Sequence, residues 1–289
     1  MEFYWNRMKN KKRIVVKVGS STLTNKDTGN LNYEKLEELV KSLSDLKNKG
    51  KDVVLVSSGA VAVGREILKI GTRPKTMAEK QACAAIGQCA LMESYHKLFA
   101  KYNQIASQIL MTKYSIDKEK SYQNIKATFN ELLRYNAIPI VNENDTVATD
   151  EIEFGENDTL AAIVAGITKA DLLIMLTDTN GLYTDDPFIN KNAKFIDTVT
   201  KKRDYVFNFA KRTSDSDVGT GGMYTKINAA NIVNNLGIDM IITNGKKPEI
   251  INKIVNGEKY GTLFVSNTEN KNNIRNYLIK SINECKAIN

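Results

Sequence analysis

Histidine and cysteine, on which hydrolytic and metal-dependent catalysis often depends, are scarce in this 289-residue chain. The single histidine, His96, falls within a helical pattern and is expected to lie on a helix surface. The sequence contains no HExxH segment, no GxSxG segment and no Cys–His couple. Zinc peptidases and hydrolases with a nucleophilic triad are therefore poor candidates. A reaction of this chain must depend on lysines, carboxylates and backbone N–H groups.

The three cysteines do not form a structural framework. Cys83, Cys89 and Cys285 contain no CxxC spacing and cannot all pair, which excludes a zinc ribbon or a disulfide scaffold. Cys83 and Cys89 fall in an Ala-rich helical pattern and are expected to be small core residues. This use of cysteine predicts a reduced, cytoplasmic protein.

Long apolar runs are also lacking. The run from Leu172 to Leu176 has five residues, whereas a membrane-spanning helix needs about 20. Residues 1–13 carry charges where the apolar part of a secretory signal would lie. With 42% hydrophobic residues, 4 prolines and 17 glycines, the composition is that of a globular chain with a sizeable core. We expect neither a membrane segment nor a signal peptide.

The net charge of +8 is concentrated near the two ends of the chain. Residues 1–13 carry +4 and residues 266–289 carry +2, which leaves +2 for the 252 residues between them. A nucleic-acid-binding protein gathers its Lys and Arg side chains on one face. We therefore expect no nucleic-acid partner.

Short apolar runs alternate with amphipathic stretches, a pattern typical of a parallel sheet covered by helices. A helix is expected from about Tyr33 to Lys49, with Asn32 as its N-terminal cap and Gly50 at its end. Strands are expected at residues 13–18, 52–56, 104–111, 137–141, 172–176, 239–243 and 262–265. Further helices are expected near residues 60–69, 77–102, 119–135, 158–169 and 224–236, with a hairpin arm at 147–154 and a helical tail after 265.

Polar and glycine residues recur after several of the predicted strands. In open α/β sheets, ligands bind beyond the carboxyl ends of the strands, where loops and helix N-termini meet. The segments are Lys17–Ser21, Ser57–Ala60, Asn142–Thr146, Gly155–Asp158, Thr177–Tyr183 and Gly219–Lys226. Because they share one edge of the sheet, they predict one ligand site.

Two of these segments suit a phosphate group. Gly219, Gly221 and Gly222 allow several backbone N–H groups to face one anion at a helix start, and Lys226 lies one turn further on. Lys17 directly precedes a Gly-Ser-Ser turn, and the strand period places it opposite its neighbouring valines. The alternatives are a plain connector for the first segment and a partly exposed strand lysine for the second.

The carboxylates near the same edge leave several interpretations open. Asp145 and Asp158 could ligate a metal ion, bind an ammonium group or cap the elements that they begin. Glu143 and Asp145 would repel each other if both were buried without a cation, which favours a bound amine, a lysine or Mg²⁺ nearby. No protein side chain is assigned as a metal ligand.

Taken together, these segments resemble the glutamate 5-kinases of the amino acid kinase family. The matching segments occur in that family's order between Ile14 and Val265. They are Val16–Ser21, Val56–Arg65, Lys80–Gln81 with Ala84–Gln88, Val141–Asp145, Gly155–Asp158, Leu176–Asp178 with Gly181–Thr184, and Gly219–Met223 with Thr225–Lys226.

The resemblance implies a three-layer αβα sandwich and ATP-dependent phosphorylation of the side-chain carboxylate of L-glutamate, the first step towards proline. It implies that Lys17 and Lys226 contact the ATP phosphates, and that Asp158 holds both lysines in place. It assigns Ser58, Asp145 and Asn157 to glutamate. The implied nucleotide-binding residues are Lys17, Thr177, Asp178, Thr220, Gly221, Gly222, Met223, Tyr224, Thr225 and Lys226. Mg²⁺ would be bound mainly by the phosphates.

The resemblance also implies an organisation and a set of partners. Residues 1–13 would be a basic extension, 14–265 the kinase domain and 266–289 a helical tail in place of a PUA domain. The acceptor lobe would cover about 14–170 and the nucleotide lobe about 171–265. Proline would inhibit, the chain would form a dimer or tetramer, and the product would pass to glutamyl phosphate reductase. The alternatives are a sister kinase acting on N-acetylglutamate, aspartate, carbamate or UMP, and a non-catalytic sensor or RNA-associated protein.

Overall fold

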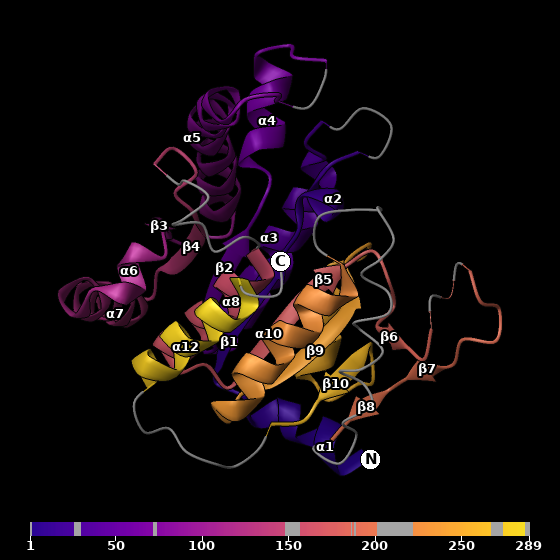
Figure 1. The fold of residues 1–289 in the computed structure, drawn as a ribbon. Helices are drawn as coiled ribbons and strands as arrows, with labels where there is room; N and C mark the ends of the chain where they lie inside the picture. Colours follow the sequence, from indigo (N-terminus) through magenta and orange to yellow (C-terminus); the bar gives the residue numbers. More distant parts are fainter. Residues whose placement is uncertain are drawn as a thin grey trace.

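A single eight-stranded sheet runs through the centre of the computed structural model (Figure 1), with the strand order β3-β4-β2-β1-β5-β9-β10-β8. The structure describes residues 2–25, 30–71, 74–147, 157–185, 187, 189–200, 222–266 and 274–286. The strands of this sheet are β1 (Arg13–Val18), β2 (Asp52–Ser57), β3 (Ala106–Met111), β4 (Ile138–Glu143), β5 (Leu172–Thr177), β8 (Thr198–Val199), β9 (Asp239–Asn244) and β10 (Thr262–Phe264). Two short strands, β6 (Leu182–Tyr183) and β7 (Phe195–Ile196), pair separately.

Helices cover both faces of this sheet, so the predicted three-layer αβα sandwich is confirmed. One face packs against α7 (Glu119–Arg134), α8 (Asn157–Thr168), α10 (Met223–Asn235) and α12 (Ile274–Lys286). The other packs against α1 (Glu2–Asn6), the 3₁₀ helix η1 (Arg7–Asn10), α3 (Tyr33–Asn48), α5 (Met77–Lys101) and α11 (Ile250–Val255). Short or peripheral helices are α2 (Ser20–Leu23), α4 (Ala60–Ile67) and α6 (Tyr114–Asp117).

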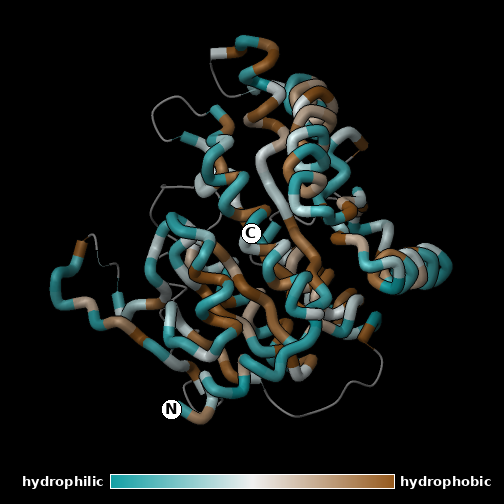
Figure 2. The backbone as a smooth tube through the Cα atoms, turned by 180° about the vertical axis from the view of Figure 1, so that it is seen from behind, coloured by the Kyte–Doolittle hydropathy of each residue, from teal (hydrophilic) through white to brown (hydrophobic). Residues whose placement is uncertain are grey.

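The sheet separates two hydrophobic cores, because successive side chains of a strand point to opposite faces. In β1, Ile14, Val16 and Val18 belong to one core, and Val15 belongs to the other. Figure 2 shows the central strands in brown, surrounded by helices in which teal and brown segments alternate. The alternation predicted for Lys17 holds, since its ammonium group pairs with a residue of α8, on the Val15 side of the sheet.

Local signals place most of the predicted elements within a few residues of their observed bounds. The Asn32 side chain accepts a hydrogen bond from the Lys35 backbone N–H and so caps α3 as expected. Gly50, at φ +74°, stands just after the end of that helix. His96 is exposed on α5, and Cys83 is buried, both as predicted. Cys89 contradicts the prediction of a core residue, because it lies on the exposed side of α5.

The sheet is not wholly parallel, and the sequence pattern did not predict its edge strand β8. β10 pairs antiparallel to β9, and the two-residue strand β8 joins the edge parallel to β10. Such short strands carry too few residues for a period to be read from sequence. The predicted hairpin arm at residues 147–154 lies, after Val147, outside the described residues. In the part of the chain that is described, no helix is both long enough and apolar enough to span a bilayer.

The segment expected to be a basic extension is packed against the sheet. Trp5 and Met8 are buried in the core that also contains α3 and α11. Arg7 and Lys11 both form ion pairs with Asp239, a fully buried carboxylate at the start of β9. Charge alone gave no sign of this packing, because the buried side chains alternate with basic ones.

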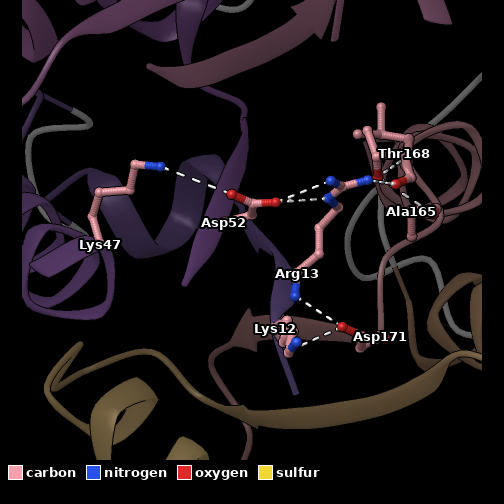
Figure 3. Close-up of polar contacts among 8 residues, drawn as sticks. Lys12, Arg13, Lys47, Asp52, Ala165, Thr168 and Asp171 are labelled. Carbon is pink, nitrogen blue, oxygen red and sulfur yellow. Dashed lines mark hydrogen bonds and ion pairs between the residues drawn. The ribbon is translucent and has the colours of Figure 1, made fainter. Parts of the chain in front are cut away.

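Helix α8 runs back over β1 and is fixed to it at both ends. At the amino end of the sheet (Figure 3), the Arg13 guanidinium pairs with Asp52 at the start of β2 and donates to the Thr168 carbonyl at the end of α8. Asp171, just before β5, accepts from the Arg13 backbone N–H at 2.9 Å. At the other end, Lys17 of β1 pairs with Asp158 of α8. The ten helical steps from Asp158 to Thr168 span roughly 15 Å, and the four extended steps from Arg13 to Lys17 span roughly 13 Å. Because these lengths are similar, the Arg13–Thr168 and Lys17–Asp158 contacts can form together.

The C-terminal helix α12 belongs to the folded core, which gives a test of its contribution to stability. Leu278 is fully buried, and its Cδ2 lies 3.3 Å from where a Cβ on Gly166 of α8 would be. We expect Leu278→Ala to lower the free energy of unfolding by about 2–5 kcal/mol, since a cavity would remain. Lys280→Ala is the matched control, because its side chain is 74% exposed. Urea unfolding measures both, and an equal loss in the two variants would contradict this packing.

Candidate active site

The carboxyl ends of five parallel strands bring the predicted site segments to one edge of the sheet. β4, β2, β1, β5 and β9 lie side by side and run in the same direction. Their ends lead into the segments that begin at Asn142, Ser57, Lys17, Thr177 and Asn244. Helices α8 and α10 begin close to the same edge, because their first turns contact β1 through Asp158.

Two lysines converge on one carboxylate at this edge. The Lys17 ammonium lies 2.7 Å from Asp158 Oδ1, and the Lys226 ammonium lies 3.1 Å from Asp158 Oδ2. The lysines come from β1 and from the first turn of α10, and the aspartate comes from the first turn of α8. Lys17 is 8% exposed, Lys226 7% and Asp158 1%. A carboxylate shared in this way holds two ammonium groups in fixed positions close to each other.

The environment of Asp158 keeps it ionised. Burial alone raises the pKa of Asp158, but the charges of Lys17 and Lys226 outweigh that effect, and the pKa lies below its usual value. The Thr225 hydroxyl also lies 2.8 Å from Asp158 Oδ2. The same hydroxyl lies 2.8 Å from the Gly222 carbonyl, so Thr225 ties the turn before α10 to the carboxylate.

A second group of polar side chains adjoins the lysine pair. Asn157, next to Asp158 in α8, donates from Nδ2 to Ser58 Oγ at 2.6 Å and to Asn142 Oδ1 at 3.0 Å. Asn142 donates from Nδ2 to Gln88 Oε1 of α5 at 2.9 Å. Because Asn157 and Asp158 are consecutive in one helical turn, the two groups meet at the start of α8.

The turn that carries Ser58 requires a glycine. Gly59 has φ +113°, in the region that side chains with a Cβ rarely adopt. This turn ends β2 and starts α4, and it leaves Ser58 half-buried beside Asn157. Asp145 lies in the turn after β4 and is half-buried, and Glu143 is the buried last residue of that strand.

The other side of the lysine pair is lined by the ends of β5 and β9. Thr177 is buried, and its hydroxyl lies 3.1 Å from a carboxylate oxygen of Asp178, which is exposed. Asn244 donates to the Asp178 carbonyl at 3.3 Å, and the Gly245 backbone N–H donates to the Thr177 carbonyl at 2.7 Å. These bonds join the loops that follow the two strands.

Some of the predicted residues fall outside the described part of the chain. Thr220 and Gly221, with Gly155 and Glu156, are among them. Gly222 is exposed before α10, and Met223 and Tyr224 are partly buried against the core. Tyr224 packs against the core, whereas Thr225 and Lys226 reach the Asp158 carboxylate.

Three residues that the structure places in these groups had no role predicted from the sequence. Gln88 and Asn142 stood within matched segments, and Asn244 stood at the end of an expected strand. The strand period could have placed Asn142 on the face of β4 that also carries Ile138 and Ile140. Its pairing with Gln88 depends on how α5 crosses the sheet, which no local pattern records.

Comparisons with known proteins show which family this chain belongs to. The model of the amino acid kinase family matches residues 12–244. Glutamate 5-kinase of Clostridium acetobutylicum is 50% identical over 89% of this chain and 96% of its own length. Glutamate 5-kinase of Thermoanaerobacter sp. is 50% identical over 88% of this chain and 68% of its own length.

A solved structure supports the fold independently. UMP kinase from Ureaplasma parvum superposes with a TM-score of 0.60 over 89% of this chain and 99% of its own, at 19% identity. At that identity the likeness concerns the fold alone. With the family match and the half-identical relatives, it leads to one conclusion: the chain belongs to the amino acid kinase family and, within it, to the group that contains the glutamate 5-kinases.

Proposed function

We propose that this protein transfers the γ-phosphoryl group of ATP to the side-chain carboxylate of L-glutamate. A carboxylate oxygen attacks the γ-phosphorus, the bond to the β-phosphate oxygen breaks, and γ-glutamyl phosphate and ADP are formed. The observation that carries the proposal is the meeting, in the first turn of α8, of the Lys17–Asp158–Lys226 cluster with the Ser58–Asn157 pair. The half-identical glutamate 5-kinases support the choice of substrate.

The two lysines would lower the main barrier of this reaction. Both reactants are anions, so their approach is opposed by charge repulsion, and phosphoryl transfer gains most from positioning and from charge stabilisation. In our proposal Lys17 and Lys226 contact the phosphates and stabilise the transferring group. Asp158 positions the lysines, and its ion pairs need not break while the remaining ammonium hydrogens bind phosphate oxygens.

The reaction needs no general base from the protein. The side chain of glutamate has an ordinary pKa of about 4.3, so the nucleophile is already ionised at neutral pH. His96 is exposed on α5, and no step of this reaction requires it. This distinguishes a carboxylate acceptor from a hydroxyl acceptor, which usually needs a base.

Glutamate would bind between Ser58, Asn157 and Asp145. The Asp145 carboxylate suits the α-ammonium group, which N-acetylglutamate and UMP lack. Ser58 and Asn157 are fixed to each other by the 2.6 Å hydrogen bond, so their polar atoms are held in place before the substrate arrives. A site that holds its polar groups in fixed positions loses little entropy on binding.

The nucleotide would lie on the side of Thr177, Asp178 and the segment from Thr220 to Lys226, in the lobe of about 171–265. Among the described residues, no three His, Cys, Asp or Glu side chains gather around a point that could hold a metal ion. In kinase sites Mg²⁺ keeps several waters and binds mainly through substrate phosphates. We therefore propose that the ion arrives with ATP, where it neutralises phosphate charge.

Four further proposals concern partners, assembly and location. Proline would inhibit the enzyme as a feedback signal, and glutamate kinetics measured in excess proline test this. The protein would act in the cytoplasm. It would form a dimer or tetramer, and sedimentation measures this oligomeric state. Its acyl phosphate is prone to hydrolysis, so hand-over to glutamyl phosphate reductase would protect it.

A panel of acceptors tests the choice of substrate. With Mg²⁺-ATP, we expect ADP release to depend on L-glutamate, and to be at least about 100-fold slower with aspartate, N-acetylglutamate or UMP. For N-acetylglutamate and UMP the reason is that the contact between the Asp145 carboxylate and a free amine is lost. Aspartate keeps the amine, but its side chain is one methylene shorter, so its carboxylate would be misplaced relative to the γ-phosphorus. Faster release with N-acetylglutamate or UMP would favour a sister kinase, and ATP binding with no acceptor would favour a sensor.

A further inference from the structure

The polar group beside the lysine pair continues into the protein as a chain of side-chain amides. It begins at Gln88, on α5, and passes through Asn142 and Asn157 to Ser58 at the mouth of the site. Gln88 is 9% exposed and Asn142 4%, whereas Ser58 and Asn157 are half-buried. The chain crosses the carboxyl edge of the sheet, from α8 on one face to α5 on the other.

Each amide in this chain has a defined direction. Gln88 Oε1 accepts from Asn142 Nδ2, so Asn142 Oδ1 faces Asn157 and accepts from it. The two hydrogens of Asn157 Nδ2 are then both in use, one to Asn142 and one to Ser58 Oγ. Asn157 Oδ1 makes no hydrogen bond to any residue that the structure describes. It remains as an acceptor.

We propose that this amide chain fixes which end of the amino-acid substrate meets which side chain, and that Gln88 is the positioning residue at its buried end. The inference rests on the proposed function. Asn157 presents only an acceptor, which suits the substrate α-ammonium together with Asp145. Ser58 accepts from Asn157, so its own hydrogen is available to donate to the α-carboxylate. Reversed amides would present an N–H group to the ammonium and would weaken binding.

The crossing of α4 and α5 explains how Gln88 reaches this position. A Cβ on Gly87 would lie 1.8 Å from the Ala60 carbonyl oxygen, and one on Gly64 would lie 1.9 Å from the Cys83 carbonyl oxygen. The two backbones are therefore in direct contact, which leaves room for glycine alone. This contact fixes α5 against the loop that follows Ser58.

A second hydrogen bond from the same face of α5 supports the loop that carries Ser58. Tyr95, two turns after Gln88, lies with its hydroxyl 2.8 Å from Ser57 Oγ, and both residues are fully buried. Ser57 in turn donates to the Ser58 carbonyl at 3.2 Å. α5 thus supports both ends of the amide chain, because Gln88 belongs to this helix and Ser58 is reached from it through Tyr95 and Ser57.

The test replaces Gln88 with a side chain of similar length that has no amide oxygen. In Gln88→Met, Asn142 and Asn157 can rotate, so we expect the KM for glutamate to rise at least about 10-fold, with the KM for ATP and kcat changed less than about 3-fold. The second readout is glutarate, which is glutamate without its amino group, used as a competitive inhibitor. The ratio of its inhibition constant to the KM for glutamate should fall at least about 10-fold, because the site no longer prefers an ammonium.

Two further variants separate positioning from general damage. Gln88→Glu keeps an oxygen that can accept from Asn142. We expect both the KM and the glutarate ratio of this variant to stay within about 3-fold of the wild-type values. Gln104→Met is the matched control, because Gln104 also bonds an asparagine amide, Asn48, at 2.9 Å, but before β3 at the amino end of the sheet. If Gln88→Met does not fold, Gln88→Leu is used in its place.

The outcomes distinguish this inference from the proposed function. A wild-type protein that neither binds nor phosphorylates glutamate overturns both. An active wild-type protein whose Gln88→Met variant keeps its KM and its glutarate ratio overturns the amide chain alone. Equal losses in Gln88→Met and Gln88→Glu also overturn it, because the acceptor oxygen would then not be the feature that matters.

Discussion

Replacement of Lys226 by alanine is expected to lower kcat by about 10²- to 10³-fold or more and to leave glutamate binding nearly unchanged. The Lys226 ammonium shares Asp158 with Lys17 at the start of α10, a helix that packs against β9, whereas Ser58 follows β2, on the other side of β1. Loss of one donor that stabilises developing charge typically costs two to three orders of magnitude. Steady-state kinetics gives kcat, and calorimetry gives the affinity for glutamate.

Lys47→Ala is the matched control for this variant. Lys47 has a similarly buried side chain and lies 4.0 Å from Asp52, but at the amino end of the sheet (Figure 3). Its replacement should leave kcat within about 3-fold of the wild-type value. Near-normal turnover in Lys226→Ala would remove the role that we assign to this lysine. Parallel losses of turnover in both variants would indicate general damage.

Replacement of Asp158 by asparagine is expected to lower both activity and stability. The change leaves two buried ammonium groups without the carboxylate that they share. Removal of one partner from a buried ion pair costs about 3–5 kcal/mol of unfolding free energy. We expect kcat/KM to fall at least about 10³-fold, because both lysines lose their positions. Asp52→Asn, in a half-exposed pair with Arg13, should cost about 1 kcal/mol or less and keep activity.

The stability difference between wild type and Asp158→Asn should depend on pH in one direction. The pKa of Asp158 is lowered in the folded state, so its contribution is complete above the ordinary aspartate pKa of about 3.9. That contribution is lost as pH falls through the lower pKa of the folded state. Urea unfolding should therefore show a constant difference from pH 7 to about pH 5, which shrinks below about pH 4. A difference that grows as pH falls would contradict the ion pairs.

The sequence predicted the features that local patterns determine. The period of β1 placed Lys17 opposite Val16 and Val18, and the turn residues after each strand placed the polar segments at one edge. Both follow from the alternation of a strand and from the parallel order of the sheet. Asp158 was expected at a helix start as a residue that could cap it, and the structure has it in the first turn of α8.

The features that were missed depend on how distant elements pack. The glycine contact between α4 and α5 sets the place of Gln88, and the burial of Met8 follows from the packing of η1 against α11. Cys89 was predicted to be buried from the small residues around it, yet that side of α5 faces solvent. Because small residues occur on both faces of this helix, the sequence does not show which face is buried. The elements that pack against the helix decide it.

The central claim is that the acceptor is the side-chain carboxylate of glutamate, and hydroxylamine trapping tests it most directly. An acyl phosphate reacts with hydroxylamine to form a hydroxamate, whereas a phosphate ester does not. The proposal predicts γ-glutamyl hydroxamate, in step with ADP, from L-glutamate and Mg²⁺-ATP, and at most traces from aspartate or N-acetylglutamate. Glutamate-dependent ADP release without hydroxamate, or hydroxamate from N-acetylglutamate in preference to glutamate, would contradict it.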